Sequence, residues 1–143
     1  MKFRRLSVAA AALVVLAAGA AARGQSFGFP WWKDAQFQRD LSLTQDQSAR
    51  IDAVFQQVIP GLRQRKTELD AQEEVLSHMI ANNESEALVT RQVDKVETIR
   101  AEMNKTRTLM LLHMRQVLSP EQRKKLNKLH EQWEKDHRRE HAE

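Results

Sequence analysis

The chain has 143 residues, 41% of them hydrophobic and 29% charged, which is enough for one small domain at most. It contains no cysteine, which excludes disulfides, and only four glycines and three prolines, which leaves few turns. The formal net charge of +4 depends on the first 22 residues. Without them 20 basic residues face 19 acidic ones, so no strong basic excess remains for nucleic-acid binding.

Residues 1–22 have the pattern of a secretory signal peptide. A basic start is followed by uncharged residues 6–22, and the small residues that end this stretch suit cleavage before Arg23. The alternative is an uncleaved anchor in the inner membrane formed by residues 6–22. Because those 17 residues fall short of the roughly 20 that span a bilayer, we predict export and cleavage.

Residues 23–33 read RGQSFGFPWWK and predict an irregular aromatic arm, because two glycines and a proline disfavour a helix. Trp31 and Trp32 either pack onto the helices that follow or form an exposed apolar patch for a partner. We favour packing, because large apolar residues usually find cover. A short helix over about residues 34–41 is expected next.

A short phrase then occurs twice, 75 positions apart. Its members are Leu43, Thr44 and Gln47 in the first copy, and Leu118, Ser119 and Gln122 in the second. Each copy predicts a helix start, in which the hydroxyl caps a free backbone amide and the glutamine three positions later reaches back. We interpret these six residues as structural capping positions, not as a repeated active site.

Two long helices are predicted between the two copies, the first ending near residue 80 and the second running over about residues 86–118. Pro60 and Gly61 interrupt the first apolar stripe, but the stripe resumes in phase, so we expect a kink and not an end. The second stripe consists of Val89, Val93, Val96, Ile99, Met103, Met110, Met114 and Val117. Nearly equal lengths across the turn at residues 81–85 predict an antiparallel hairpin, which brings Leu43 close to Leu118.

A last helix is predicted from Pro120, with Leu126, Leu129 and Trp133 as its apolar stripe and fraying from Glu134. The predicted fold class is therefore all-α: a long antiparallel helical hairpin with shorter flanking helices over residues 34–136, followed by a charged tail at residues 137–143. A hairpin this thin cannot surround its own apolar face. The part that the flanking helices leave uncovered is expected to meet another copy or a client chain.

The sequence gives little support for catalysis. Residues 137–141 have the H-x-x-E-H form of inverted zinc proteases, but a catalytic zinc needs a third ligand and a walled cleft that a charged tail does not offer. We therefore expect no enzyme and no required cofactor.

Metal binding without catalysis is the more credible use of the tail. His130, Glu134, His137 and His141 span only about 60° around a helix and could bind zinc, nickel or copper with help from a second chain. The other interpretation, which we favour, is a solvated polar face.

The two phrases, the signal-peptide pattern and the hairpin together resemble the LTxxQ family. This family includes the Spy and CpxP periplasmic stress proteins and the heavy-metal-resistance proteins of the ZraP and CnrX type. The first copy matches in full, and the second has Ser119 in place of threonine. The resemblance implies an all-α, often dimeric fold in which hairpins form a curved cradle. It also implies either ATP-independent chaperoning, joined in some members to restraint of an envelope-stress sensor, or binding of zinc, nickel, cobalt or copper.

We predict the periplasmic chaperone or stress-adaptor role, because the hairpin interleaves apolar and basic residues whereas His137 and His141 lie in the charged tail. The expected partners are a second copy, unfolded clients and, for an adaptor, the sensor, with no nucleic acid. The alternatives are a periplasmic metal-binding sensor or resistance protein and a purely structural dimeric helical module. The candidate client surface consists of Trp31, Trp32, Phe55, Met103, Met110, Arg63, Arg65 and Arg107.

Overall fold

The computed structural model describes residues 29–140, which form one short 3-10 helix and four α-helices with no strand among them. In chain order these are η1 (Trp31–Lys33), α1 (Ala35–Asp40), α2 (Gln45–Ala81), α3 (Glu86–Gln116) and α4 (Pro120–Glu140). The predicted all-α class and helical hairpin are confirmed. The predicted signal peptide, the first six residues of the arm and His141 lie outside the described residues.

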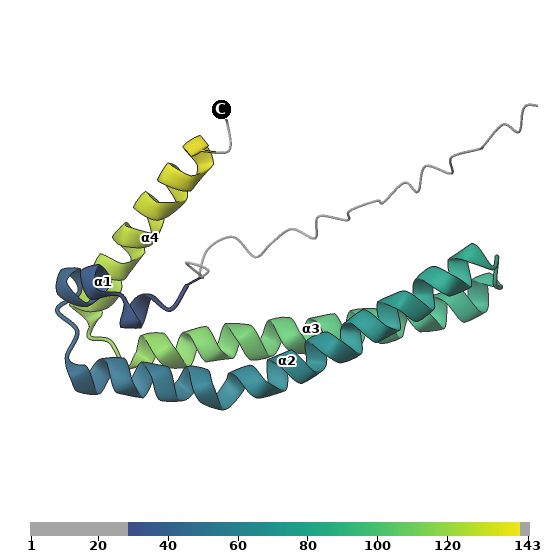
Figure 1. Ribbon diagram of the computed structural model, residues 1–143, viewed down its shortest axis with the longest axis horizontal. Coiled ribbons are helices and arrows are strands. Elements are labelled where there is room, and N and C mark those ends of the chain that lie inside the picture. Colours follow the sequence, from purple (N-terminus) through teal and green to yellow (C-terminus); the bar gives the residue numbers. More distant parts are fainter. Residues whose placement is uncertain (1–28, 141–143) are drawn as a thin grey trace, which may run out of the picture.

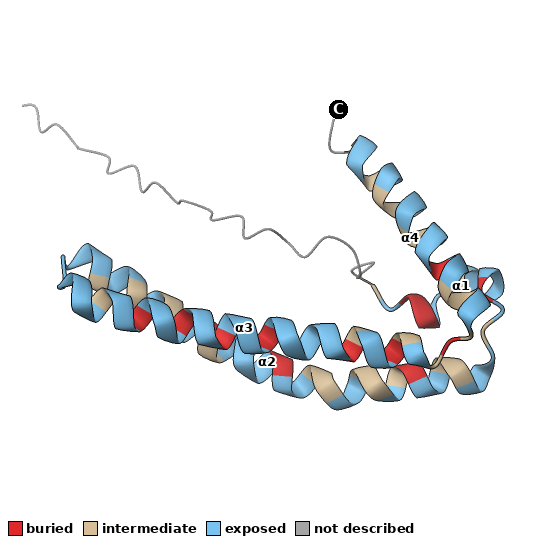
Figure 2. Cartoon of the chain, turned by 180° about the vertical axis from the view of Figure 1, so that it is seen from behind, coloured by how far each residue is buried: buried red, intermediate tan, exposed pale blue. Residues whose placement is uncertain are grey.

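Helices α2 and α3 lie side by side in antiparallel directions and form the body of the molecule (Figure 1). Most of the buried positions follow the seam between them (Figure 2), and within each helix they are spaced by 3, 4, 7 or 11 residues, as one helical face requires. They are Ile51, Leu62 and Leu69 on α2 and Val96, Ile99, Met103, Met110 and Met114 on α3. Each such side chain contributes about 1.5–3 kcal/mol when fully buried, so this seam is the main source of stability.

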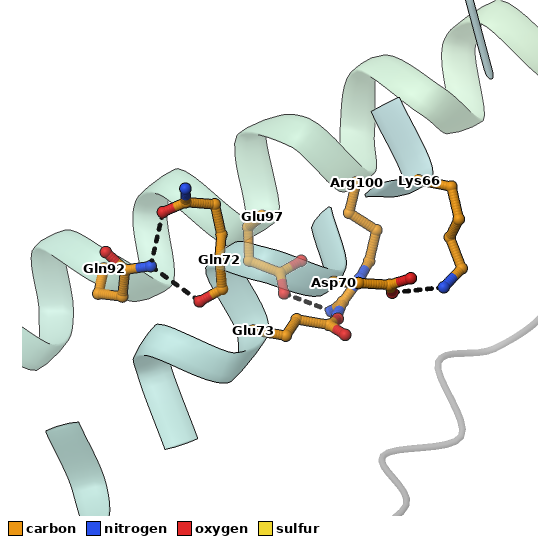
Figure 3. A network of polar contacts seen from close by, with 7 residues as sticks. All are labelled: Lys66, Asp70, Gln72, Glu73, Gln92, Glu97 and Arg100. Atoms are coloured by element: carbon orange, nitrogen blue, oxygen red, sulfur yellow. Dashed lines mark hydrogen bonds and ion pairs between the residues drawn. The ribbon is translucent and has the colours of Figure 1, made fainter. Parts of the chain in front are cut away.

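The seam differs from the predicted stripe at one turn of α3. Val93 is exposed, and Gln92 takes the buried position instead. The Gln92 amide donates to the backbone carbonyl and the side-chain oxygen of Gln72, at 2.9 and 3.0 Å (Figure 3). These bonds replace those that water would make, which is why a polar side chain is tolerated there.

Helix α2 continues through Pro60, as the in-phase apolar stripe predicts. Proline has no backbone N–H, so one bond of the helical ladder is missing at this point. Figure 1 shows α2 bent rather than straight. The long helix therefore follows α3 along a curve.

Helix α4 leaves the open end of the hairpin and rises away from it, with η1 and α1 in the corner between them (Figure 1). It continues to Glu140, past Glu134, where the charged residues predict fraying. The Trp133 ring lies 6.5 Å from the Phe29 ring and 4.0 Å from the His137 ring, which holds this part of the helix in place. Within residues 29–140, no helix is long and apolar enough to cross a membrane.

Candidate binding groove

Both copies of the repeated phrase form the predicted capping boxes. Thr44 Oγ1 accepts from the backbone N–H of Gln47 at 3.0 Å, and Gln47 Oε1 accepts from the backbone N–H of Thr44 at 3.2 Å. Ser119 Oγ and Gln122 Oε1 repeat the arrangement, at 3.2 and 2.9 Å. Two backbone donors at each helix start are thereby satisfied.

The two boxes also meet each other. The side-chain amide of Gln47 donates from Nε2 to Gln122 Oε1 at 2.8 Å, and the side-chain amide of Gln122 donates from Nε2 to Gln47 Oε1 at 2.9 Å. Gln122 further donates to the Leu41 carbonyl at 3.1 Å, and Leu118 packs in the same apolar core as Leu43. This junction fixes how α1 and α4 leave the hairpin. The sequence predictions do not include this pair of side-chain amides, although a glutamine stands at the same place in both copies.

The arm is attached to α2 through Asp52. Trp32 Nε1 donates to Asp52 Oδ1 at 3.0 Å, and Lys33 Nζ lies 2.9 Å from the same oxygen. The indole bond, followed by the ammonium of Lys33, lowers the pKa of Asp52 below its ordinary value of 3.8. Gln38 donates to the Trp32 carbonyl at 2.9 Å, which ties the arm to α1 as well.

Trp31 and Trp32 are only 5% and 4% exposed, so their packing is confirmed and an exposed tryptophan patch is wrong. The two rings meet edge to face at 5.8 Å, and Trp32 lies 5.0 Å from Phe55. The indole bond to Asp52 satisfies the one polar group that burial of Trp32 would otherwise leave without a partner.

The arm, α2 and α3 together line an open groove with a volume of about 460 Å³. Seven of the eight predicted client-surface residues line it: Trp31, Trp32, Phe55, Arg63, Met103, Arg107 and Met110. Met103 and Met110 are each 7% exposed because they belong to the seam. They form part of the groove wall and leave little of their own surface accessible. Arg65 lies outside the groove and forms ion pairs with Glu68 and Glu102, at 2.8 and 2.9 Å.

The basic residues of the hairpin differ in whether an acid neutralises them. Arg100 reaches across from α3 to Glu73 on α2, and Lys66, which also lines the groove, pairs with Asp70 (Figure 3). Arg63 and Arg107 are exposed and have no carboxylate partner within residues 29–140. The apolar groove therefore has two guanidinium groups whose charge no neighbouring acid offsets.

A second cavity of about 410 Å³ lies between α3 and α4, and Trp31 lines both this cavity and the groove. Its polar lining includes Arg115, which donates to Asn127 Oδ1 at 2.6 Å. Burial, with a smaller effect of Arg123, lowers the pKa of Arg115.

The predicted metal stripe is only partly brought together. His130 Nε2 lies 3.1 Å from Glu134 Oε1, whereas His137 donates from Nδ1 to the Trp133 carbonyl at 2.9 Å and packs on the Trp133 ring. Among the described residues, no three histidine, aspartate or glutamate side chains gather in a way that could hold a metal ion. His141, the fourth member, lies outside them.

Comparison with known protein families gave a match. A family model described as "LTXXQ motif family protein" matches residues 32–130, which is well over half of the chain and includes both capping boxes. Neither the search of curated proteins nor that of solved structures gave a match.

Proposed function

Because this chain belongs to the LTXXQ motif family, we propose that it is a periplasmic, ATP-independent chaperone or envelope-stress adaptor that holds unfolded clients. The observation that carries the proposal is the open apolar groove with Arg63 and Arg107 beside it. Export through the signal-peptide pattern of residues 1–22 is part of the same proposal.

The groove has the chemistry that a holding chaperone needs. Unfolded chains expose apolar side chains, which can be covered by the walls formed by Trp32, Phe55 and the methionines. Methionine is flexible and polarisable, so a wall that contains it adapts to side chains of different shape. The two arginines attract acidic residues of the client, and an open groove lets the client leave without an energy source. We infer a binding protein and not an enzyme.

A second copy is the first partner that we propose. At the turn between α2 and α3 the hairpin exposes Val75, Ile80 and Leu88, which are 44%, 60% and 42% accessible. Covering such residues is a common reason for self-association. An envelope-stress sensor would be a further partner if the chain also acts as an adaptor.

The client-binding proposal is tested by measuring light scattering from reduced, aggregating α-lactalbumin without ATP. The chain should suppress scattering at near-stoichiometric amounts, and Ile59→Ser, which alters the groove wall, should weaken suppression severalfold. Val58→Ser is the matched control, because Val58 is also half-buried on α2 but does not line the groove. Complete absence of suppression by the unmodified chain would refute the proposal.

A further inference from the structure

The groove is large enough for one small amphipathic molecule. Its volume of about 460 Å³ lies within the range of roughly 300–1,000 Å³ that is usual for small-molecule sites. Its lining on α2 extends from Phe55 to Lys66, a rise of about 16 Å at 1.5 Å per residue. The site is therefore an elongated apolar trough and not a point contact.

The charges of the groove define the head group that would fit. Arg63 on α2 and Arg107 on α3 line the same cavity, and neither has a carboxylate partner in the described part of the chain. A guanidinium group binds a carboxylate through two parallel hydrogen bonds, and this pairing is stronger beside an apolar surface than in open water. The arrangement is complementary to one anionic group attached to one apolar chain.

We propose that this groove binds a single free fatty acid, with its carboxylate at Arg63 and Arg107 and its hydrocarbon chain along Trp32, Phe55 and Met103. A diacyl lipid would need room for a second chain. The assignment shares its site with the proposed chaperone function but does not require that clients bind there.

Dodecanoate, kept below its micellar concentration, is the probe for this site. Titration followed by tryptophan fluorescence and calorimetry should show saturable one-to-one binding, because Trp31 and Trp32 line the groove. Arg63→Ala/Arg107→Ala should weaken binding by about tenfold or more, since two charge-assisted contacts are lost. The affinity of Arg63→Lys/Arg107→Lys for dodecanoate should lie between that of the unmodified chain and that of the double alanine variant, because lysine keeps the charge without the paired hydrogen-bond geometry.

The matched control is Arg91→Ala/Lys95→Ala, which removes two exposed cations of α3 that do not line the groove and should change binding by less than about twofold. Dodecyl maltoside, with the same chain and an uncharged head, should bind far more weakly. The proposal is overturned by equal binding of the two probes, by an equal loss in the control variant, or by binding to anionic vesicles alone. The absence of saturable dodecanoate binding also overturns it.

The outcome is separable from that of the chaperone proposal. Suppression of α-lactalbumin aggregation without dodecanoate binding would sink the fatty-acid site and leave the chaperone function in place. Dodecanoate binding without suppression would do the reverse. Helix content measured by circular dichroism should stay unchanged in all the arginine variants, because both side chains are exposed.

Discussion

Two glutamines, one from each copy of the repeated phrase, hold the open end of the hairpin together. Each of them closes its own capping box and also binds the other amide, so Gln47 and Gln122 serve both a local and a long-range purpose. Neither glutamate nor serine could replace these glutamines. An ionised glutamate has no hydrogen-bond donor, and the serine side chain is too short to reach across. The repeat is therefore a structural device that joins two distant helix starts.

Replacing either glutamine with alanine should lower the free energy of unfolding by about 1–2 kcal/mol, because caps and partly buried hydrogen bonds are lost. The Gln47→Ala/Gln122→Ala double variant should lose less than the sum, because after one change the other amide already lacks its partner. Urea denaturation followed by circular dichroism measures all three. Gln57→Ala, at an exposed position of α2, should change stability by less than about 0.5 kcal/mol, and strict additivity of the two changes would contradict a direct pair.

Asp52 should make the attachment of the arm pH-dependent. Its pKa is lowered in the folded protein, so its contribution to stability is present above the ordinary value of 3.8 and is lost as pH falls through the lower folded value. Asp52→Asn should therefore lower the free energy of unfolding at pH 7 by about 1 kcal/mol and have little effect near pH 2. Thermal unfolding of both proteins across this range tests it. Asp94→Asn, at an exposed site on α3, is the control, and a difference that persists in acid would contradict the assignment.

At the scale of the helices, Gly61 lowers the stability of α2 although packing does not require a glycine there. It lies inside the helix directly after Pro60, and a Cβ atom built on it meets nothing within 4 Å. Gly61→Ala should raise the free energy of unfolding by about 0.5–1 kcal/mol, because the unfolded chain has fewer conformations to lose. Ala53→Gly, at another exposed position of α2, should lower it by a similar amount. Chemical denaturation measures both, and destabilisation by the alanine would show that another chain approaches this surface.

The helix starts could be predicted from sequence because capping is a local property. Thr44 and Ser119 lie within four residues of the groups that they satisfy, so their identity and spacing are enough. The extension of α4 could not be predicted in this way. It depends on a contact between Trp133 and Phe29, which are far apart in the chain, and the charged residues after Glu134 gave the opposite indication.

At the scale of the whole molecule, the groove was predictable in its composition but not in its geometry. The sequence predicts a mixed apolar and basic client surface, and most of its residues do meet at one place. The sequence does not predict which arginines lack an ion-pair partner. Arg65 is neutralised by Glu102 from the facing helix, whereas Arg63 is not neutralised. The partner of the buried Trp32 indole could not be predicted either, because Asp52 lies 20 residues further along the chain.

The shape of the hairpin leads to a prediction about assembly. A pair of helices has no third element to cover its outer faces. The apolar side chains near the turn, Val75, Ile80 and Leu88, remain exposed, whereas α1, η1 and α4 lie at the open end of the hairpin. If a second copy covers the turn, as the proposed dimer requires, the thermal midpoint should rise with protein concentration and light scattering should give twice the chain mass.

Ile80→Lys should then raise the dissociation constant of the dimer by about tenfold or more, because a charge is placed on the most exposed of these apolar positions. Analytical ultracentrifugation across a range of concentrations measures it. Leu109→Lys is the control, because Leu109 is 42% exposed on the same hairpin but is distant in sequence from the turn and lines neither cavity. Equal weakening by both changes would mean that the copies meet along the length of the hairpin, and a monomer at all concentrations would remove the dimer while leaving the groove to act within one chain.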